Sequence, residues 1–463
     1  MKEFTYEELN SLEYDLPEEV LKYKMAGDLS GARESIGRWL GRPVTEGMKT
    51  RLRLELEMLD LLEEEFPYTK EEMVHLFAEQ VPDFTLRDLE RLDREGLAEW
   101  IFLEGEKHYI SSTVSNVLGK DREVRKRAGI AEEVSEEKRY LFEAIREMKE
   151  KGSITKRFCL RTSVGVKEEY FHSGMYLKAH LPLPACLHQV SDVTILDHSD
   201  CKVTIDPEDA LCRTICFEDR PVQNHPFFVE YEYTVHAVYH DFSEEDRKRS
   251  QEIFEEDRDA VLFTKEQGPH IRFTPYLRDL AREIVGDEKE PLAMASGIYD
   301  YITTKVKYSY MKEYFLITQI PEYCAKNLRG DCGVQALLFI TLCRICGIPA
   351  KWQSGLYTNP GSVGPHDWAM FYVEPYGWLF ADPSFGGSAY HSGDEDRRKF
   401  YFGNLDPFRM AANNAFSMPF ACRKRFRPID PYDNQTGEIE TEERGLASHE
   451  LERKREFIVR KEG

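Results

Sequence analysis

The segment with the strongest structural signals covers residues 327–350 and has the sequence NLRGDCGVQALLFITLCRICGIPA. Gly330 permits a tight turn, and Asp331 is a suitable N-cap for the residues that follow. Apolar side chains then recur at helical spacing over residues 334–345, and a Gly-Ile-Pro sequence stops the helix. Cys332 is therefore predicted in the first turn of a buried helix.

The first turn of a helix is a favourable place for a reactive cysteine. Backbone N–H groups lack intrahelical partners there, and the helix dipole is positive. Both effects favour the thiolate, which is the nucleophilic form of Cys332. The alternative is packing, because most free cysteines only fill space in a core. The position of Cys332 alone does not decide between the two.

Two downstream residues favour the nucleophile. Strands are predicted at 351–356, 366–373 and 378–382, with a loop at 357–365. His366 stands at the entrance of the second strand and Asp382 at the end of the third, and the short turn between these strands lets them pair. His366 is then expected to take the thiol proton, while Asp382 orients the imidazole and stabilises its charged form.

The motifs around these three residues resemble one family. They are Gly-Asp-Cys-Gly at 330–333, Cys-Gly-Ile-Pro-Ala at 346–350, His-Asp-Trp at 366–368 and Gly-Trp-Leu-Phe-Ala-Asp-Pro at 377–383. Their order and spacing resemble the transglutaminase-like superfamily over about residues 270–390. The resemblance implies a papain-like α+β core in which Cys332, His366 and Asp382 are catalytic. It also implies a β-sandwich before that core, as in bacterial transglutaminase-like proteins.

The predicted function is a cysteine-dependent amide hydrolase, a peptidase or amidase that forms an acyl-thioester with a peptide or protein substrate. Hydrolysis is favoured because bacterial relatives of this type often look like proteases and no separate amine site is visible. Two alternatives stay open. One is an acyltransferase that crosslinks protein glutamines to amines, and the other is a binding or scaffold protein that keeps the fold without turnover.

Further site residues follow from what this chemistry requires. An oxyanion hole needs donors, and the backbone N–H of Cys332 is one. Gln319 is the candidate second donor, and the alternatives are three tyrosines: Tyr308, Tyr310 and Tyr323. Trp368 and Trp378 are candidates to line the cleft, with core packing as the alternative reading.

No metal and no cofactor are predicted. Cys343 and Cys346 form a Cys-x-x-Cys pair, but no second pair stands at metal-ligand spacing and both fall in the buried helix. Seven histidines near the β-rich segment also lack compact ligand spacing and are interpreted as strand and loop residues: His172, His180, His188, His198, His225, His236 and His240. A calcium-binding run of spaced acids is missing as well.

The pattern along the chain predicts an α+β protein with four parts. These are a helical domain at 1–145, a β-sandwich-like domain at 150–245, the catalytic domain at 255–425 and a polar segment at 426–463. Side chains alternate with a period of two over residues 228–236, which predicts a half-buried strand in the second part, and residues 438–463 are expected as a surface strand, helix or tail. Within the first part, two helices near 68–80 and 85–95 precede a hairpin near 100–110, the outline of a winged helix. Charges of both signs alternate on the second helix, which is typical of a solvated face, so a protein partner is expected and not DNA.

Charge and hydropathy exclude other classes of function. The formal net charge is −22, which argues against a broad phosphate-binding surface and hence against a nucleic-acid partner. The N-terminus lacks the basic and apolar regions of a signal peptide, and no run of about 18 apolar residues predicts a membrane span. A cytoplasmic protein with ten reduced cysteines is therefore expected.

Overall fold

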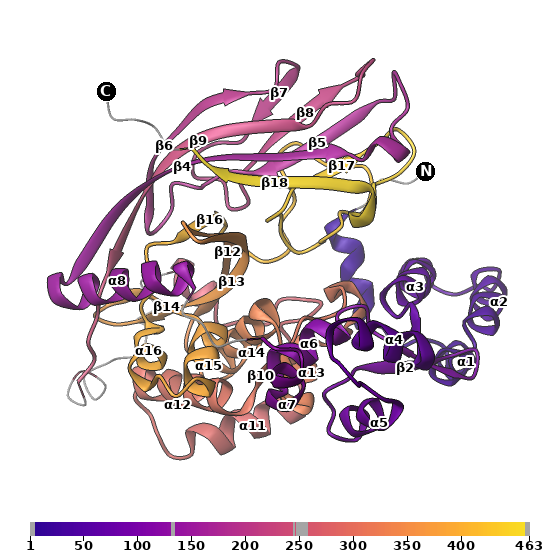
Figure 1. Cartoon of the computed structure of the whole chain (residues 1–463), viewed down its shortest axis with the longest axis horizontal. Helices are drawn as coiled ribbons and strands as arrows, with labels where there is room; N and C mark the ends of the chain where they lie inside the picture. Colours follow the sequence, from indigo (N-terminus) through magenta and orange to yellow (C-terminus); the bar gives the residue numbers. More distant parts are fainter. Residues whose placement is uncertain (1–4, 131–134, 244–245, 247–257, 459–463) are drawn as a thin grey trace.

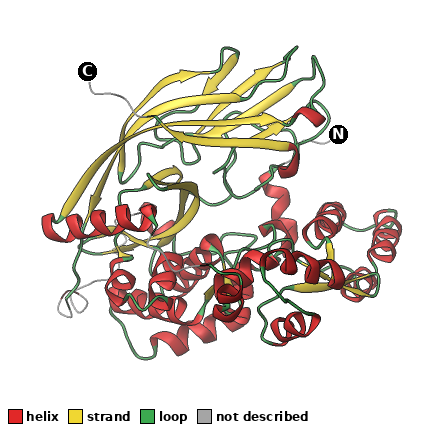
Figure 2. Ribbon diagram, viewed as in Figure 1, coloured by secondary structure: helices red, strands yellow, loops and turns green. Residues whose placement is uncertain are grey.

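The computed structural model describes residues 5–130, 135–243, 246 and 258–458. Helices and strands are both abundant, so the protein is an α+β protein. Figure 1 shows the long strands of a two-sheet sandwich above a helical core, with the N-terminal helices at the lower right. Figure 2 shows the same separation of strand and helix. The predicted domain boundary at residue 255 lies outside the described residues.

The N-terminal part is helical, with a small sheet inserted. Its first elements are α1 (Glu18–Ala26), α2 (Leu29–Leu40) and α3 (Glu46–Glu65), followed by β1 (Tyr68–Thr69), α4 (Lys70–Gln80), α5 (Leu86–Arg94), β2 (Trp100–Leu103) and β3 (Glu106–Tyr109). The predicted helices and hairpin are confirmed, and Thr85 begins α5 with a capping box to Asp88. Arg91 of α5 contacts Glu95 and Asp121 at 2.8 and 2.7 Å, so nearby carboxylates balance its charge.

This part packs against the segment that leads to Cys332. Glu99 lies 2.7 Å from Lys312 and 3.4 Å from Arg329. Lys120, at the end of α6 (Thr113–Lys120), donates a 2.6 Å hydrogen bond to the hydroxyl of Ser309. Buried ionic and polar contacts therefore join the N-terminal part to the core.

The sandwich consists of two four-stranded sheets. One has the order β18-β4-β9-β6 and the other β17-β5-β8-β7. The strands are β4 (Ser153–Val166), β5 (Leu177–Pro182), β6 (Val190–His198), β7 (Lys202–Ile205), β8 (Thr214–Asp219), β9 (Phe227–Val238), β17 (Glu438–Glu440) and β18 (Leu451–Phe457). Alternate residues of β9 are buried from Phe227 to Val235, which confirms the half-buried strand predicted from the period of two.

The C-terminal segment completes both sheets. Strand β17 pairs with β5, and β18 pairs with β4. The expectation of a surface strand, helix or tail is thereby resolved, because this segment forms two edge strands. Its polar residues are satisfied locally: Glu438 pairs with Lys424, and Glu440 accepts hydrogen bonds from the backbone N–H groups of Arg425 and Phe426.

The core places helices against a five-stranded antiparallel sheet of order β15-β14-β13-β12-β16. Its strands are β12 (Ala350–Asn359), β13 (Ser362–Val373), β14 (Gly377–Ala381), β15 (Phe402–Gly403) and β16 (Arg409–Asn413). The helices are α11 (Pro275–Val285), α12 (Pro291–Lys305), α13 (Ile320–Asn327), α14 (Cys332–Ile345), α15 (Pro383–His391) and α16 (Glu395–Phe400). Helix α14 begins at Cys332, as predicted, and is buried along most of its length.

One local prediction was wrong. Residues 357–365 were expected to form a loop, but β12 and β13 continue through them as a long hairpin. The turn is confined to Pro360 and Gly361, where the side chain of Asn359 accepts a 2.9 Å hydrogen bond from the Gly361 N–H. His366 therefore lies inside β13 and not at its entrance. None of the described helices combines the length and the apolar character needed to cross a membrane.

Candidate active site

Cys332 is held at the N-terminus of α14 by its neighbours. Asp331 is the N-cap, and its carboxylate accepts hydrogen bonds from the Val334 N–H at 3.1 Å and the Tyr314 hydroxyl at 2.5 Å. Gly333 is required by close packing, since a Cβ there would lie 2.2 Å from the Tyr314 hydroxyl and 2.7 Å from Asp367. The sequence Gly-Asp-Cys-Gly thus packs the start of the helix tightly beneath Tyr314.

The thiol of Cys332 contacts a carboxylate. It donates a 3.2 Å hydrogen bond to Oδ2 of Asp367, while Gln435 donates to Oδ1 of the same residue. Gln435 also donates a 2.8 Å hydrogen bond to Asp433, whose carboxylate accepts from Ser354 as well. A buried acidic cluster therefore surrounds the sulfur.

These surroundings oppose a thiolate. Burial raises the pKa of the Cys332 thiol well above its ordinary value, and the charges of Asp367 and Asp331 raise it further. Burial and the neighbouring carboxylates therefore oppose the thiolate that the helix N-terminus is expected to favour.

His366 and Asp382 do meet. Nε2 of His366 lies 2.7 Å from Oδ2 of Asp382, as the pairing of β13 with β14 predicted. Asp382 is also the N-cap of α15, where it accepts 2.9 Å hydrogen bonds from the Phe385 N–H and the Ser384 hydroxyl. Arg409 on β16 adds a 2.8 Å ion pair to Asp382 Oδ2. All three side-chain partners of Asp382, namely His366, Ser384 and Arg409, are buried.

The charges of this group follow from its burial. Burial alone would raise the pKa of Asp382, but the attraction of His366 and Arg409 and several hydrogen bonds lower it, so Asp382 is ionised. Burial lowers the pKa of His366, and its partner Asp382 offsets only part of that effect. His366 is therefore a neutral imidazole at pH 7. Its Nε2–H donates to Asp382, which leaves Nδ1 as a proton acceptor.

The sheet separates the thiol from this imidazole. Successive side chains of a strand point to opposite faces. Asp367 and Phe371 share the face that packs on α14, where Phe371 contacts Phe339 with ring centroids 5.6 Å apart. His366 points to the other face, next to Phe385 at 4.5 Å. Within the described part of the chain, no hydrogen bond links Cys332 to His366. The structure thus assembles His366 with Asp382 and places Cys332 beside Asp367.

Gln319 lies in a different environment from the one its candidate role requires. Its Nε2 donates a 3.0 Å hydrogen bond to the backbone carbonyl of Pro269, so the amide donor is occupied. It lines a surface hollow with Lys312, Tyr323 and Lys326, and Cys332 is not among the lining residues. Of the alternative tyrosines, Tyr308 is near enough to the sulfur to interact with its charge. Burial raises the pKa of Tyr308, and the charge of Cys332 raises it further.

The two tryptophans have separate surroundings. Trp368 is fully buried, and its indole N–H donates a 2.6 Å hydrogen bond to Gln353 on the neighbouring strand. Trp378 pairs with Tyr372 and lies against Lys351 and Phe263. Tyr372 is six residues along β13 from His366, a separation of about 20 Å in a strand. Trp368 therefore packs beside His366, with ring centroids 6.0 Å apart, whereas Trp378 does not flank it.

Sequence reasoning missed Asp367, Gln435 and Arg409. The period of the strand held a signal for Asp367, because the residue after His366 must point to the opposite face, which α14 covers. Arg409 stands among apolar residues after Asp406, a pattern typical of a buried ion pair, and it contacts Asp406 at 2.7 Å. No local signal links Gln435 to Asp367, since they are separated by 68 positions.

One group of potential metal ligands lies close together in the described residues, and it does not include Cys343 or Cys346. Cys343 is buried within α14 and Cys346 is its C-cap, and this pair joins no larger group of potential ligands in the described residues. A separate cluster of His180, Cys216 and Cys422 does bring three ligand atoms together in the sandwich. This cluster lies outside the candidate active site.

Comparisons with known proteins agree with the core. Residues 278–383 match the family described as the Transglutaminase-like superfamily, so the chain contains a transglutaminase-like core. This match includes Cys332, His366 and Asp382. No curated protein matches the chain.

Several solved structures are similar at low identity. A proposed cysteine protease from Cytophaga hutchinsonii has 14% identity and a TM-score of 0.40, with 67% of this chain and 94% of that chain covered. The periplasmic domain of TgpA from Pseudomonas aeruginosa has 15% identity and a TM-score of 0.30, with 55% and 96% covered. A proposed protease from Parabacteroides distasonis has 9% identity and a TM-score of 0.22, with 52% and 60% covered.

Proposed function

We propose that the protein is a cysteine-dependent amide hydrolase in which Cys332 is the nucleophile, His366 the general base and Asp382 the residue that orients it. The observation that carries this proposal is the buried contact of 2.7 Å between His366 and Asp382, reinforced by Arg409. A neutral imidazole fixed by an ionised carboxylate is what proton abstraction from a thiol requires. The match of residues 278–383 to the superfamily supports the same assignment.

The proposed reaction uses these groups in sequence. Nδ1 of His366 accepts the thiol proton, and the sulfur attacks the carbonyl carbon of the substrate amide. The protonated imidazole gives its proton to the departing amine as the C–N bond breaks, which leaves an acyl-thioester on Cys332. Water, activated by His366, then hydrolyses the thioester and regenerates the thiol. Asp382 stays ionised and stabilises the imidazolium in both steps.

This reaction requires a rearrangement around the thiol. Because Cys332 and His366 lie on opposite faces of the sheet, a new rotamer of the thiol is not enough, and β13 has to turn locally so that His366 can replace Asp367 as its partner. The described arrangement therefore corresponds to a resting state. Asp367 is held by Gln435 of the C-terminal segment. Substrate binding near that segment is the step that we expect to release the sulfur.

One observation favours a second candidate, a non-catalytic protein that keeps the fold. The thiol is bonded to a carboxylate, its pKa is raised, and no hydrogen bond within the described residues connects it to His366. A binding or scaffold protein requires no reactive thiol, so this arrangement is compatible with such a function. The two candidates differ in whether Cys332 reacts.

The deciding experiment compares wild type with Cys332→Ala and His366→Ala on a pool of fluorescent peptides, with and without an excess of a primary-amine probe. Hydrolysis that both substitutions abolish supports the proposal. Probe incorporation that depends on Cys332 would replace it with acyl transfer to amines. If no product forms, and iodoacetamide labels Cys332 no faster than Cys159, the scaffold reading holds.

A further inference from the structure

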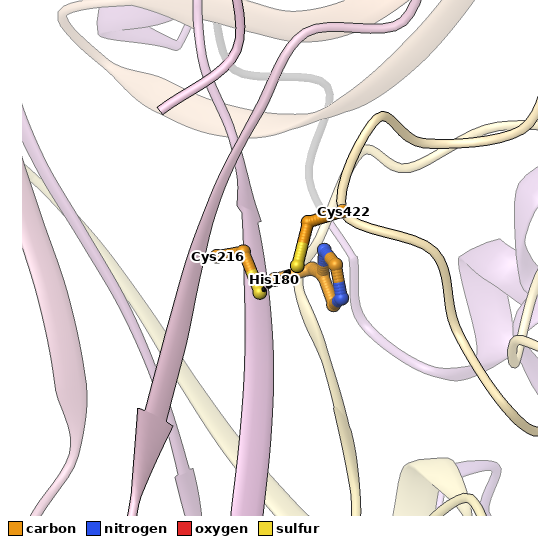
Figure 3. A group of neighbouring side chains, drawn as sticks. All are labelled: His180, Cys216 and Cys422. Carbon is orange, nitrogen blue, oxygen red and sulfur yellow. Dashed lines mark hydrogen bonds between the residues drawn. The ribbon is translucent and has the colours of Figure 1, made fainter. Parts of the chain in front are cut away.

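Three residues of the sandwich converge far from Cys332. His180 on β5 and Cys216 on β8 are direct cross-strand partners, and Cys422 comes from the loop before β17. One potential ligand atom from each lies within 4.8 Å of the others. Figure 3 shows the two sulfur atoms close together and the imidazole ring of His180 beside them.

His180 is a buried polar group without a hydrogen-bond partner among the described residues. It has 0% exposure, and neither Nδ1 nor Nε2 is paired there. Its ring packs near Phe420, with centroids 5.1 Å apart. Leaving a buried polar group unpaired costs about 1–3 kcal/mol, so a histidine is poorly explained here as packing alone. A neutral imidazole is a common metal ligand, and a metal ion would give a ring nitrogen of His180 the partner it lacks.

The two cysteines are near each other and near positive charge. Sγ of Cys422 lies 2.7 Å from Sγ of Cys216, farther apart than the roughly 2.05 Å of a covalent disulfide. Lys178, two residues before His180 on β5, and Glu218, two residues after Cys216 on β8, are charged side chains that interact with both sulfurs.

We propose that His180, Cys216 and Cys422 bind a zinc ion or a similar thiophilic divalent cation. Zinc prefers thiolate and imidazole ligands in tetrahedral geometry, with Zn–S bonds of about 2.3 Å. Two sulfurs on one such ion lie roughly 3.8 Å apart, which follows from that bond length and the tetrahedral angle. The thiols therefore need to separate by about 1 Å, which side-chain rotation can supply.

The charge balance fits this assignment. The negative charges of two thiolates offset the two positive charges of a divalent cation, and the imidazole is neutral. The buried site therefore has no net charge when the metal is bound. The positive charges of Lys178 and Lys424 interact with His180. Lys424 is itself paired with Glu438. No fourth histidine, cysteine or carboxylate joins the cluster among the described residues. We expect a water molecule as the fourth ligand.

The site has a clear structural consequence. Cys422 is the anchor that connects the segment before β17 to the sheet that contains β5 and β8. The same segment continues to Asp433 and Gln435, which contact the surroundings of Cys332. Metal binding would therefore fix the chain that holds Asp367. No metal was expected from ligand spacing along the chain, and Cys216 and Cys422 are separated by 206 positions, which no local spacing motif reveals.

The test measures metal content and stability in the full chain. Wild-type protein is purified under reducing conditions, incubated with zinc and separated from free zinc, and bound zinc is measured by mass spectrometry of the element. We expect about one zinc ion per chain, and its loss in Cys216→Ser and Cys422→Ser. Cys159→Ser and Cys346→Ser are matched controls that should retain the metal. In the cobalt form, wild type should show a thiolate-to-cobalt charge-transfer band that Cys422→Ser lacks.

A second measurement guards against misfolded variants. Addition of zinc to metal-free wild type should raise the melting temperature, because a ligand that binds only the folded state stabilises it. The melting temperature of metal-free Cys422→Ser, whose substitution lies in a partly exposed loop residue, should not respond. Three results would overturn the proposal. The first is a wild type that retains no zinc, the second is serine variants that retain as much zinc as wild type, and the third is a protein that contains a Cys216–Cys422 disulfide and binds no metal.

Discussion

The thiol of Cys332 donates a 3.2 Å hydrogen bond to Asp367, the residue that directly follows His366 in β13. The two neighbours therefore serve different groups: Asp367 meets the sulfur on one face of the sheet, and His366 meets Asp382 on the other. The motif His-Asp-Trp supplies both contacts. Because of this arrangement, the reactivity of Cys332 depends on Asp367.

Asp367→Asn is expected to accelerate alkylation of Cys332. The substitution removes a negative charge that raises the thiol pKa, and an amide N–H can donate to the sulfur where the carboxylate accepted. The thiolate fraction should rise about tenfold for each unit by which the pKa falls. The measurement is the rate of iodoacetamide labelling at pH 7.5, followed by peptide mapping. Labelling of Cys159 provides the internal reference.

A matched control is Asp279→Asn, because Asp279 is an exposed aspartate on α11 that pairs with Arg282. It should leave the labelling of Cys332 unchanged. Equal rates in wild type and Asp367→Asn would show that Asp367 does not suppress the thiolate.

Arg409→Met is expected to destabilise the core strongly. Arg409 has no exposed surface and is paired with the buried carboxylates of Asp382 and Asp406. Removing one partner of a buried ionic group leaves an uncompensated charge, at a cost of about 3–5 kcal/mol. Thermal unfolding should show the loss as a lower melting temperature. Arg38→Met removes an exposed pair with Glu19 and should have little effect.

How much of this could be predicted depends on the range of the signal. Helix α14 was predicted because its cap, apolar period and stop all lie within 20 or so residues, which is local information. Strand β9 was predicted for the same reason, from its alternation. The pairing of His366 with Asp382 also followed from a short hairpin. Each of these features rests on residues that are near one another in the sequence.

The features that were missed depend on distant segments. Gln435 reaches Asp367 only because β17 and β18 return the chain to the sandwich, a long-range pairing that no local pattern specifies. The raised pKa of Cys332 follows from this assembly, since the dipole of α14 was evident in the sequence and the surrounding carboxylates were not. The cluster of His180, Cys216 and Cys422 likewise requires β5, β8 and the C-terminal loop to meet.

Asp430→Asn is expected to stabilise the protein at neutral pH and not near pH 4. Burial raises the pKa of Asp430 well above its ordinary value, and the neighbouring Asp433 raises it further. The folded state then holds a proton that the unfolded chain releases above about pH 4, so stability falls as the pH rises through the raised pKa. An asparagine has no such titration, and its side-chain oxygen can still accept the 2.8 Å hydrogen bond from the Tyr432 N–H.

The measurement is the melting temperature of wild type and Asp430→Asn from pH 4 to 8. The difference should grow with pH. The exposed Asp396, which pairs with Lys149, gives the control substitution Asp396→Asn. A difference between wild type and Asp430→Asn that stays constant over this range would rule out a raised pKa at this carboxyl.

Glu99→Gln is expected to loosen the N-terminal part from the core. Glu99 is the common partner of Lys312, Arg329 and the Tyr323 hydroxyl. Burial alone would raise its pKa, but the two cations and the hydrogen bonds lower it, so this carboxylate stabilises the fold above about pH 4.3 and the stabilisation is lost as the pH falls further. A neutral amide would leave both cations without their counter-charge, at a cost of about 2 kcal/mol. Limited proteolysis should therefore release the N-terminal part faster from Glu99→Gln than from wild type at pH 7, and the difference between the two proteins should shrink only as the pH falls below about 4. Glu95→Gln, at the nearby exposed pair with Arg91, should be cleaved like wild type at both pH values. If Glu99→Gln were as resistant as wild type at pH 7, the apolar contacts alone would suffice to hold the two parts together.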